Sequence, residues 1–78
     1  MPFAMIPVTS SNVAAIGYDP PARICRVQFV NGTLYDYADV PPAVFSAFLN
    51  VPSKGQFVDR VLKFGGFEVT KVTPDDAP

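Results

Sequence analysis

Hydrophobic and polar positions alternate most regularly in the middle of the chain, in residues 22–30 and 33–38. A period of two is typical of a β-strand that buries one face. The two runs are joined by Val30-Asn31-Gly32, and an Asn-Gly pair between alternating runs is a strong hairpin signal. The pattern therefore predicts a β-hairpin around which the rest of the chain is organised.

Two registers of this hairpin fit the sequence. A two-residue turn at Asn31-Gly32 would place Val27 opposite Asp36. A three-residue loop, with Gly32 in the left-handed region, would gather the apolar residues on one face and pair opposite charges on the other. Its cross-strand pairs would be Phe29 with Thr33, Val27 with Tyr35, Cys25 with Tyr37 and Arg26 with Asp36. Such pairs contribute ~0.2–1 kcal/mol each, so we prefer the three-residue loop.

Three further stretches have strand character. Met5–Val8 is a candidate edge strand, because Pro7 cannot donate a backbone hydrogen bond and is tolerated at an edge. Val13–Tyr18 and Phe67–Val72 both alternate. The expected faces of the first of these two consist of Ala14, Ile16 and Tyr18, and of Val13, Ala15 and Gly17.

Two stretches show helical spacing instead. Proline is well placed in a first helical turn, so Pro41-Pro42 predicts a helix start, with Pro52 beyond its end. Ser53 followed by Gln56 fits a capping box and predicts a second helix that runs to about Phe64. The expected buried residues are Val44, Phe45, Phe48 and Leu49 in the first helix, and Phe57, Val58, Val61, Leu62 and Phe64 in the second.

These elements predict an α+β fold: a small antiparallel β-meander of three or four strands with two short helices packed on one face. The expected core consists of Val27, Phe29, Tyr35, Phe45, Phe48, Val61 and Leu62. We expect a single domain over residues 9–72, preceded by an apolar segment over 1–8. Residues 73–78 form an acidic tail that we expect to be disordered.

Composition narrows the chemistry that these 78 residues can support. The chain has no histidine and one cysteine, Cys25, so it lacks the commonest general base and any Cys/His zinc spacing. The seven acidic residues are scattered, and there is no glycine-rich phosphate loop. We therefore expect no enzyme activity, no metal and no cofactor, and we expect Cys25 to be a small buried hydrophobe.

Charge and the N-terminal residues bear on location and partners. The net charge of −1 lacks the basic surplus that is usual in nucleic-acid-binding proteins. The apolar start of the chain has no basic residue and is broken by Pro2 and Pro7, unlike a signal peptide. No run approaches the ~20 apolar residues of a membrane helix. The expectation is a cytoplasmic protein without membrane contact.

The first candidate binding feature is the pair Tyr35 and Tyr37. Aromatic residues at positions i and i+2 project from one face of a strand, and RNA-binding sheets stack bases on such pairs. The alternative is that both rings belong to the core and that their hydroxyls reach its rim. The hairpin register preferred above favours the core.

The second candidate feature is the segment Ser53–Lys63. Ser53, Lys54 and Gly55 begin a helix, and free N–H groups at a helix start can bind a phosphate or carboxylate. Arg60 and Lys63 are three residues apart and hence on one helical face. The alternative is a capped helix with a solvated polar side, which is the more common use of such a pattern.

Several short motifs follow one another between Thr9 and Phe64. They are Ser10-Ser11, Gly17-Tyr18-Asp19, Val27-x-Phe29, Asn31-Gly32, Tyr35-Asp36-Tyr37, Val40-Pro41 and Ser53-Lys54-Gly55-x-Phe57. This order resembles the KTSC domain, a family named for its occurrence at the C-terminus of some lysyl-tRNA synthetases. The family also includes stand-alone small proteins of bacteria and their phages. Through the synthetase attachment, the resemblance implies RNA binding, which is an argument by association.

Two functional hypotheses follow. The leading one is a small non-catalytic module for protein–protein interaction or regulation, since the chain is 49% hydrophobic and lacks catalytic groups. The alternative is an RNA- or nucleic-acid-binding module that stacks bases on Tyr35 or Tyr37 and contacts phosphates through Lys54, Arg60 and Lys63. An unidentified protein is thus the expected partner and RNA the alternative one. Self-association through the apolar N-terminus or a sheet edge stays open.

Overall fold

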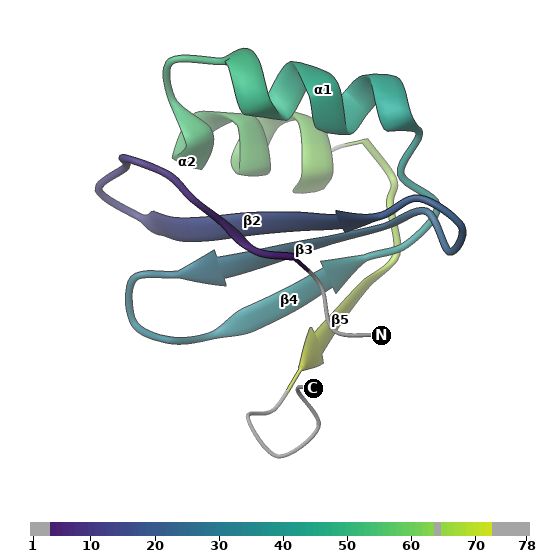
Figure 1. Cartoon of the computed structure of the whole chain (residues 1–78), viewed down its shortest axis with the longest axis horizontal. Coiled ribbons are helices and arrows are strands. Elements are labelled where there is room, and N and C mark those ends of the chain that lie inside the picture. The colour runs from purple at the N-terminus through teal and green to yellow at the C-terminus, as the bar shows by residue number, and fades with distance from the viewer. Residues whose placement is uncertain (1–3, 64, 73–78) are drawn as a thin grey trace.

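The computed structural model describes residues 4–63 and 65–72 of the chain. Its elements are β1 (Ile6–Pro7), β2 (Val13–Asp19), β3 (Ile24–Phe29), β4 (Leu34–Tyr37), α1 (Pro42–Asn50), α2 (Lys54–Phe57), η1 (Val58–Lys63) and β5 (Val69–Val72). All neighbouring strands are antiparallel, and the helices lie together on one face of the sheet (Figure 1). The predicted α+β fold is confirmed, but the sheet has five strands rather than three or four, in the order β1-β2-β3-β4-β5.

The outer strands account for the difference. The predicted edge strand around Pro7 is present as β1, where Ile6 pairs with Ile16 of β2. At the other edge, β5 pairs with β4 and begins at Val69, two residues later than predicted. The pairing of β4 with β5 joins segments separated by both helices, so the sequence carries no local signal for it.

The central hairpin has the three-residue loop. Gly32 has a φ of 91°, in the left-handed region that glycine tolerates. Its N–H donates to the carbonyl of Phe29, and the N–H of Phe29 donates to the carbonyl of Thr33, both at 2.9 Å. The observed register pairs Cys25 with Tyr37, Arg26 with Asp36 and Val27 with Tyr35, which confirms the prediction.

The core lies between the helices and the inner strands. Its buried hydrophobic residues are Val13, Ile16, Cys25, Val27, Tyr37, Val40, Phe48, Phe57, Val58 and Leu62. The rings of Phe48 and Phe57 stack with centroids 4.8 Å apart and join α1 to α2. Of the predicted core, Val27, Phe48 and Leu62 are buried. Phe29, Tyr35, Phe45 and Val61 are only partly buried against it.

Two predicted orientations are wrong. Strict alternation puts Val13 on the face of Ala15, but Val13 is fully buried in the core with Ile16. A register shift between Val13 and Ala15 adds a residue to β2, and such a β-bulge moves the residues before it to the other face. Leu49 was expected on the buried side of α1 but is 39% exposed, because α1 buries a narrower face centred on Phe48.

The second helix begins as predicted at the Ser53 cap, whose Oγ accepts the N–H of Gln56 at 3.3 Å. It continues from α2 into η1, which has π-helical geometry and ends at Lys63. The predicted helix end at Phe64 and the predicted disordered tail over 73–78 lie outside the described residues. Within those residues, no helix is long and apolar enough to cross a membrane.

Candidate binding groove

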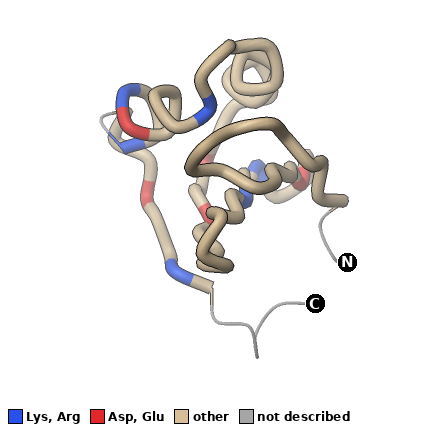
Figure 2. The backbone as a smooth tube through the Cα atoms, turned by 90° about the vertical axis from the view of Figure 1, so that its left-hand side faces the viewer, with Lys and Arg blue, Asp and Glu red and all other residues tan. Residues whose placement is uncertain are grey.

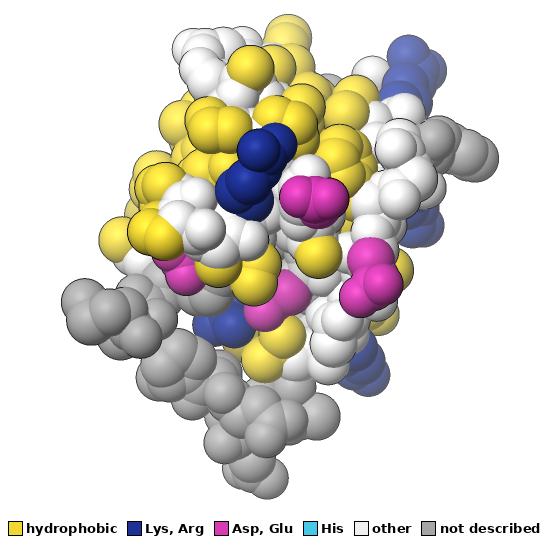
Figure 3. Space-filling view, turned by 90° about the vertical axis from the view of Figure 1, so that its right-hand side faces the viewer, with side chains coloured by type: hydrophobic (Ala, Val, Ile, Leu, Met, Phe, Trp, Pro, Cys, Tyr) yellow, Lys and Arg dark blue, Asp and Glu magenta, His cyan; other side chains and the backbone are white. Residues whose placement is uncertain are grey.

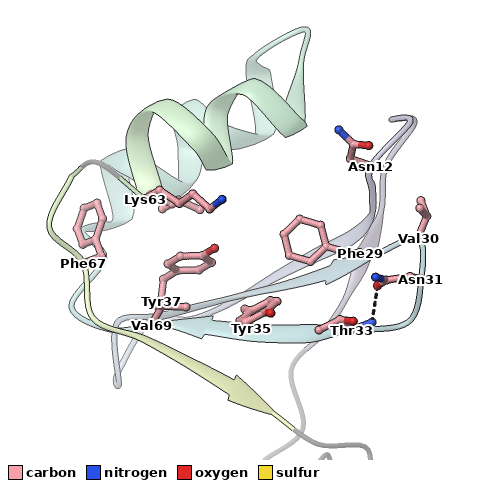
Figure 4. Close-up of a pocket in the computed structure, with 11 residues that line it drawn as sticks. Asn12, Phe29, Val30, Asn31, Thr33, Tyr35, Tyr37, Lys63, Phe67 and Val69 are labelled. Carbon is pink, nitrogen blue, oxygen red and sulfur yellow. Dashed lines mark hydrogen bonds between the residues drawn. The ribbon is translucent and has the colours of Figure 1, made fainter.

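A hollow of about 500 Å³ lies between η1 and the strands β3, β4 and β5 (Figure 4). It exists because the helices pack over β2 and β3, whereas β5 extends the sheet past them and leaves Val69 51% exposed. Four aromatic rings line it, those of Phe29, Tyr35, Tyr37 and Phe67. We call this hollow the aromatic groove.

The structure separates the two tyrosines that the sequence treats alike. Tyr37 is a core residue, only 3% exposed, and its burial raises the pKa of its hydroxyl. Tyr35 is half-buried and meets Phe29 edge to face, with ring centroids 5.7 Å apart. Both rings point to the helix side of the sheet (Figure 4). Tyr35 therefore forms the accessible wall of the groove, and Tyr37 forms its floor.

The polar residues of the groove are few, and none is acidic. Lys63 lies between η1 and the ring of Tyr37 (Figure 4) and forms an ion pair with Asp59 at 3.5 Å. The two partners are about two-thirds exposed, so this pair holds Lys63 only weakly. At the hairpin end, the side chain of Asn31 accepts the N–H of Thr33 at 3.0 Å. The lining is thus mainly apolar and aromatic, with one cation and the uncharged polar side chains of Asn12, Asn31 and Thr33.

Phe67 closes one end of the groove, and its position depends on Gly65. A Cβ on Gly65 would overlap the carbonyl oxygen of Val61 and lie 2.8 Å from the Phe67 ring. Sequence reasoning assigned Phe67 and Val69 only to a strand. Their shared alternation was the available signal, but it places them beside the groove only once β5 is known to pair with β4.

The predicted Ser53-Lys54-Gly55 feature lies at the corner between the helices. The ammonium of Lys54 donates to the carbonyls of Val51 at 2.6 Å and Leu49 at 3.3 Å, at the end of α1. A Cβ on Gly55 would approach the side chain of Asn12 to 3.0 Å, so glycine lets α2 pack closely there. These contacts hold the fold together, and anion binding by this corner stays a prediction.

The three predicted basic residues do not share one hollow. Lys63 lines the aromatic groove, while Arg60 lines a separate hollow beside Pro52 and Phe57, and Lys54 lines neither. Figure 2 shows positive and negative positions mixed along the second helix and β5. Figure 3, which views the opposite end, shows charges of both signs among apolar side chains. The face in Figure 3 therefore shows no continuous basic patch.

Cys25 and Arg26, neighbours on β3, face opposite sides of the sheet. Cys25 is fully buried as predicted, and desolvation raises the pKa of its thiol to about 12. Arg26 is bonded to Asp36 through two hydrogen bonds of 2.7 and 3.0 Å, which raise the pKa of the guanidinium. Within the described ranges, no group of three or more histidine, cysteine or acidic side chains could hold a metal ion.

A model of the KTSC domain matches residues 9–64, most of the chain. The chain belongs to the KTSC domain family. The crystal structure of a KTSC domain protein from Yersinia pestis superposes with a TM-score of 0.83 at 39% identity. That match covers 91% of this chain and 99% of the other. The fold described above is therefore that of a solved KTSC protein.

Two sequence relatives place the KTSC domain in different contexts. A protein of Tsukamurella paurometabola is 44% identical over 59 residues, which cover 76% of this chain and 88% of the relative. A lysine–tRNA ligase of a Nostoc species is 31% identical over 61 residues, which make up only 11% of that enzyme. The KTSC segment is thus a small part of the ligase but nearly all of the shorter relative.

Proposed function

We propose that this KTSC protein is a non-catalytic binding module and that its aromatic groove binds a segment of another protein. The arrangement of the groove carries this proposal: four aromatic rings surround a hollow whose rim includes the exposed Val30 and Val69. Contiguous exposed apolar surface is typical of interaction sites, and binding pockets are typically apolar with a few polar groups.

The chemistry of the lining supports a role without catalysis. Lys63, Tyr35 and Tyr37 are the ionisable groups in the groove, and no carboxylate, thiol or imidazole lines it. The pKa of the Tyr37 hydroxyl is raised, which removes it further from acid–base chemistry at neutral pH. Such a surface can bind and orient a partner, but it offers no general base and no activated nucleophile.

A nucleic-acid-binding module is the second candidate, because Tyr35 and Lys63 lie in the same groove. A base could stack on one and a phosphate could pair with the other. Two observations favour the protein segment. The buried ring of Tyr37 offers no open stacking face, and the ammonium of Lys54 is already bonded to two carbonyls. Phosphate contacts normally require several free cations.

The test is a pull-down from a lysate of the source cells with the tagged full chain, with and without nuclease. Val69→Asp places a carboxylate on the groove rim, and Leu49→Asp makes the same change on α1 outside the groove. Both residues are exposed, at 51% and 39%, so both variants should fold. We expect a protein retained by the wild type and by Leu49→Asp, lost with Val69→Asp and unaffected by nuclease.

Two results would contradict the proposal. Equal retention by the two variants would move the interaction away from the groove. Capture of RNA, with proteins that leave the resin after nuclease treatment and at high salt, would replace the protein segment by nucleic acid. Circular dichroism of each variant, recorded beforehand, confirms that lost binding does not reflect lost folding.

A further inference from the structure

The edge of the sheet next to the aromatic groove is open. β5 is the last strand in the sheet, and across residues 4–63 and 65–72 nothing pairs with its outer side. The N–H of Ala38 donates to the carbonyl of Glu68 at 2.8 Å, which fixes the hydrogen-bonding phase of the β4–β5 ladder. In an antiparallel ladder every second residue turns its N–H and C=O away from its partner strand. In β5 these outward residues are Val69 and Lys71.

The side chains of the same two residues project from the groove side of the sheet, and Val69 lines the groove itself. Val69 is opposite Tyr37 and Lys71 is opposite Tyr35, and paired residues project from the same face of a sheet. The free backbone groups of β5 and the aromatic groove therefore adjoin one another. An added strand would lie about 4.8 Å from β5 and would point every second side chain toward the groove.

We propose that the partner segment binds in an extended conformation as a sixth strand on the outer edge of β5, with alternate apolar side chains over the aromatic groove. This proposal rests on the groove being the binding site, and it adds how the partner binds and what sequence it has. Main-chain hydrogen bonds to Val69 and Lys71 supply sequence-independent affinity. The groove selects which side chains the partner presents at alternate positions, as in other cases of strand addition.

Charge specifies the partner further. No acidic residue lines the groove, Lys63 is held by an exposed ion pair, and Lys71 takes part in none of the ion pairs formed by the described residues. Both lysines would attract a segment with aspartate or glutamate on its groove-facing side. A second copy of the chain fits less well, because pairing of two β5 edges would bring two Lys71 side chains onto one face.

The probe is a phage-displayed library of random 12-residue peptides, selected on the immobilised full chain and followed by synthesis of the enriched peptide. In the enriched peptide we expect apolar residues at alternate positions. We also expect an acidic residue at one of these same alternate positions, so that it faces the groove side. Val69→Pro removes the outward N–H but no ladder hydrogen bond, whereas Val69→Ala keeps it. Both variants lose the valine side chain, so their difference isolates the N–H. We expect Val69→Pro to bind at least tenfold more weakly than Val69→Ala, measured by fluorescence anisotropy.

The unmodified protein provides an independent arm that does not depend on variant folding. Two N-methylated peptides are compared, one modified at the odd-numbered amides and one at the even-numbered amides. Because only one of these sets faces β5, one peptide should lose binding and the other should keep its affinity within threefold. Lys71→Glu should lower the affinity for the acidic peptide at least threefold. If both N-methylated peptides lose binding, or if neither does, strand addition is overturned.

The remaining outcomes separate this proposal from the one on which it rests. If Val69→Pro binds as tightly as Val69→Ala while Tyr35→Ala abolishes binding, the groove binds peptides without strand addition. If no peptide is enriched, or Tyr35→Ala also leaves binding unchanged, the groove is not the site and both proposals fail. If light scattering shows a wild-type dimer that Val69→Pro makes monomeric, the edge belongs to a second copy.

Discussion

The two halves of one sheet face differ although they belong to the same five strands. In the covered half, β2 and β3 lie beneath the helices, and Ile16 and Val27 are fully buried. In the open half, β4 and β5 face the groove, Tyr35 is half-buried and Val69 is 51% exposed. Both halves are rich in apolar side chains, but the helices pack directly on the covered half. Over the open half η1 borders the groove, and of the described β4 and β5 residues only Tyr37 is buried.

Under the proposed function, this difference separates the residues that stabilise this KTSC protein from those that would bind its partner. Burial of apolar surface drives folding, so the covered half carries most of the stabilisation. The open half retains apolar surface in water, which contributes little to the fold but is available to a partner. A small domain can sustain such a surface only if its covered half is well packed, as the stacked Phe48 and Phe57 are.

The largest expected effect tests this contrast directly. Phe48→Ala removes a fully buried ring from the covered half and should lower the free energy of unfolding by about 3–5 kcal/mol. Val69→Ala in the open half should change it by less than about 0.5 kcal/mol. Urea denaturation followed by circular dichroism measures both. Equal losses would show that the open half is as important to the fold as the covered half.

The next effect concerns the loop that supports the open half. Gly65→Ala would force the Val61 carbonyl and the Phe67 ring apart and should cost about 1–3 kcal/mol. Part of this cost comes from the contact of the new methyl group with the Phe67 ring. Phe67→Ala should therefore remove that part of the cost in the double variant. A double-mutant cycle should give a coupling energy of about 0.5 kcal/mol or more. Additive losses would mean that Phe67 does not rest on Gly65.

A third effect tests burial in the covered half through pH. The pKa of the Cys25 thiol is raised from 9.0 to about 12, so the folded state holds this proton more tightly than the unfolded state. The resulting stability is fully present below pH 9 and is lost as the pH rises toward 12. Relative to Cys25→Ala, the wild type should lose up to about 1.4 kcal/mol per pH unit in that window.

Denaturation curves recorded at several alkaline pH values measure this difference. The pKa of Tyr37 is raised mainly by desolvation but also by Cys25, so both proteins are compared in a Tyr37→Phe background, where this contribution is absent. Parallel stability profiles for the wild type and Cys25→Ala would contradict the burial of the thiol.

The smallest effect belongs to the open half. Lys63→Gln breaks an ion pair whose side chains are 64% and 66% exposed, so stability should change by less than about 0.5 kcal/mol. Affinity for the acidic peptide should nevertheless fall, which thermal melts and anisotropy would separate. A large loss of stability would place Lys63 among the structural residues of the fold, as Lys54 is.

Much of the fold could be predicted from the sequence, because its strongest signals are local. The three-residue loop Val30-Asn31-Gly32, the cross-strand pair Arg26–Asp36 and the Ser53 cap all join residues close in sequence, and the structure confirms each one. Local signals also pointed to Tyr35 and Tyr37 as partners on one strand face. They could not show that one ring is buried and the other borders a groove.

The sequence by itself determined the α+β class, the hairpin register, the helix starts and the family, since each depends on neighbours along the chain. Tertiary structure decided the rest. The bulge before Ala15, the engagement of Lys54 by carbonyls and the placement of β5 beside β4 all depend on where separate elements meet. The aromatic groove exists only because two helices cover part of a five-stranded sheet, a geometric mismatch that no single segment encodes.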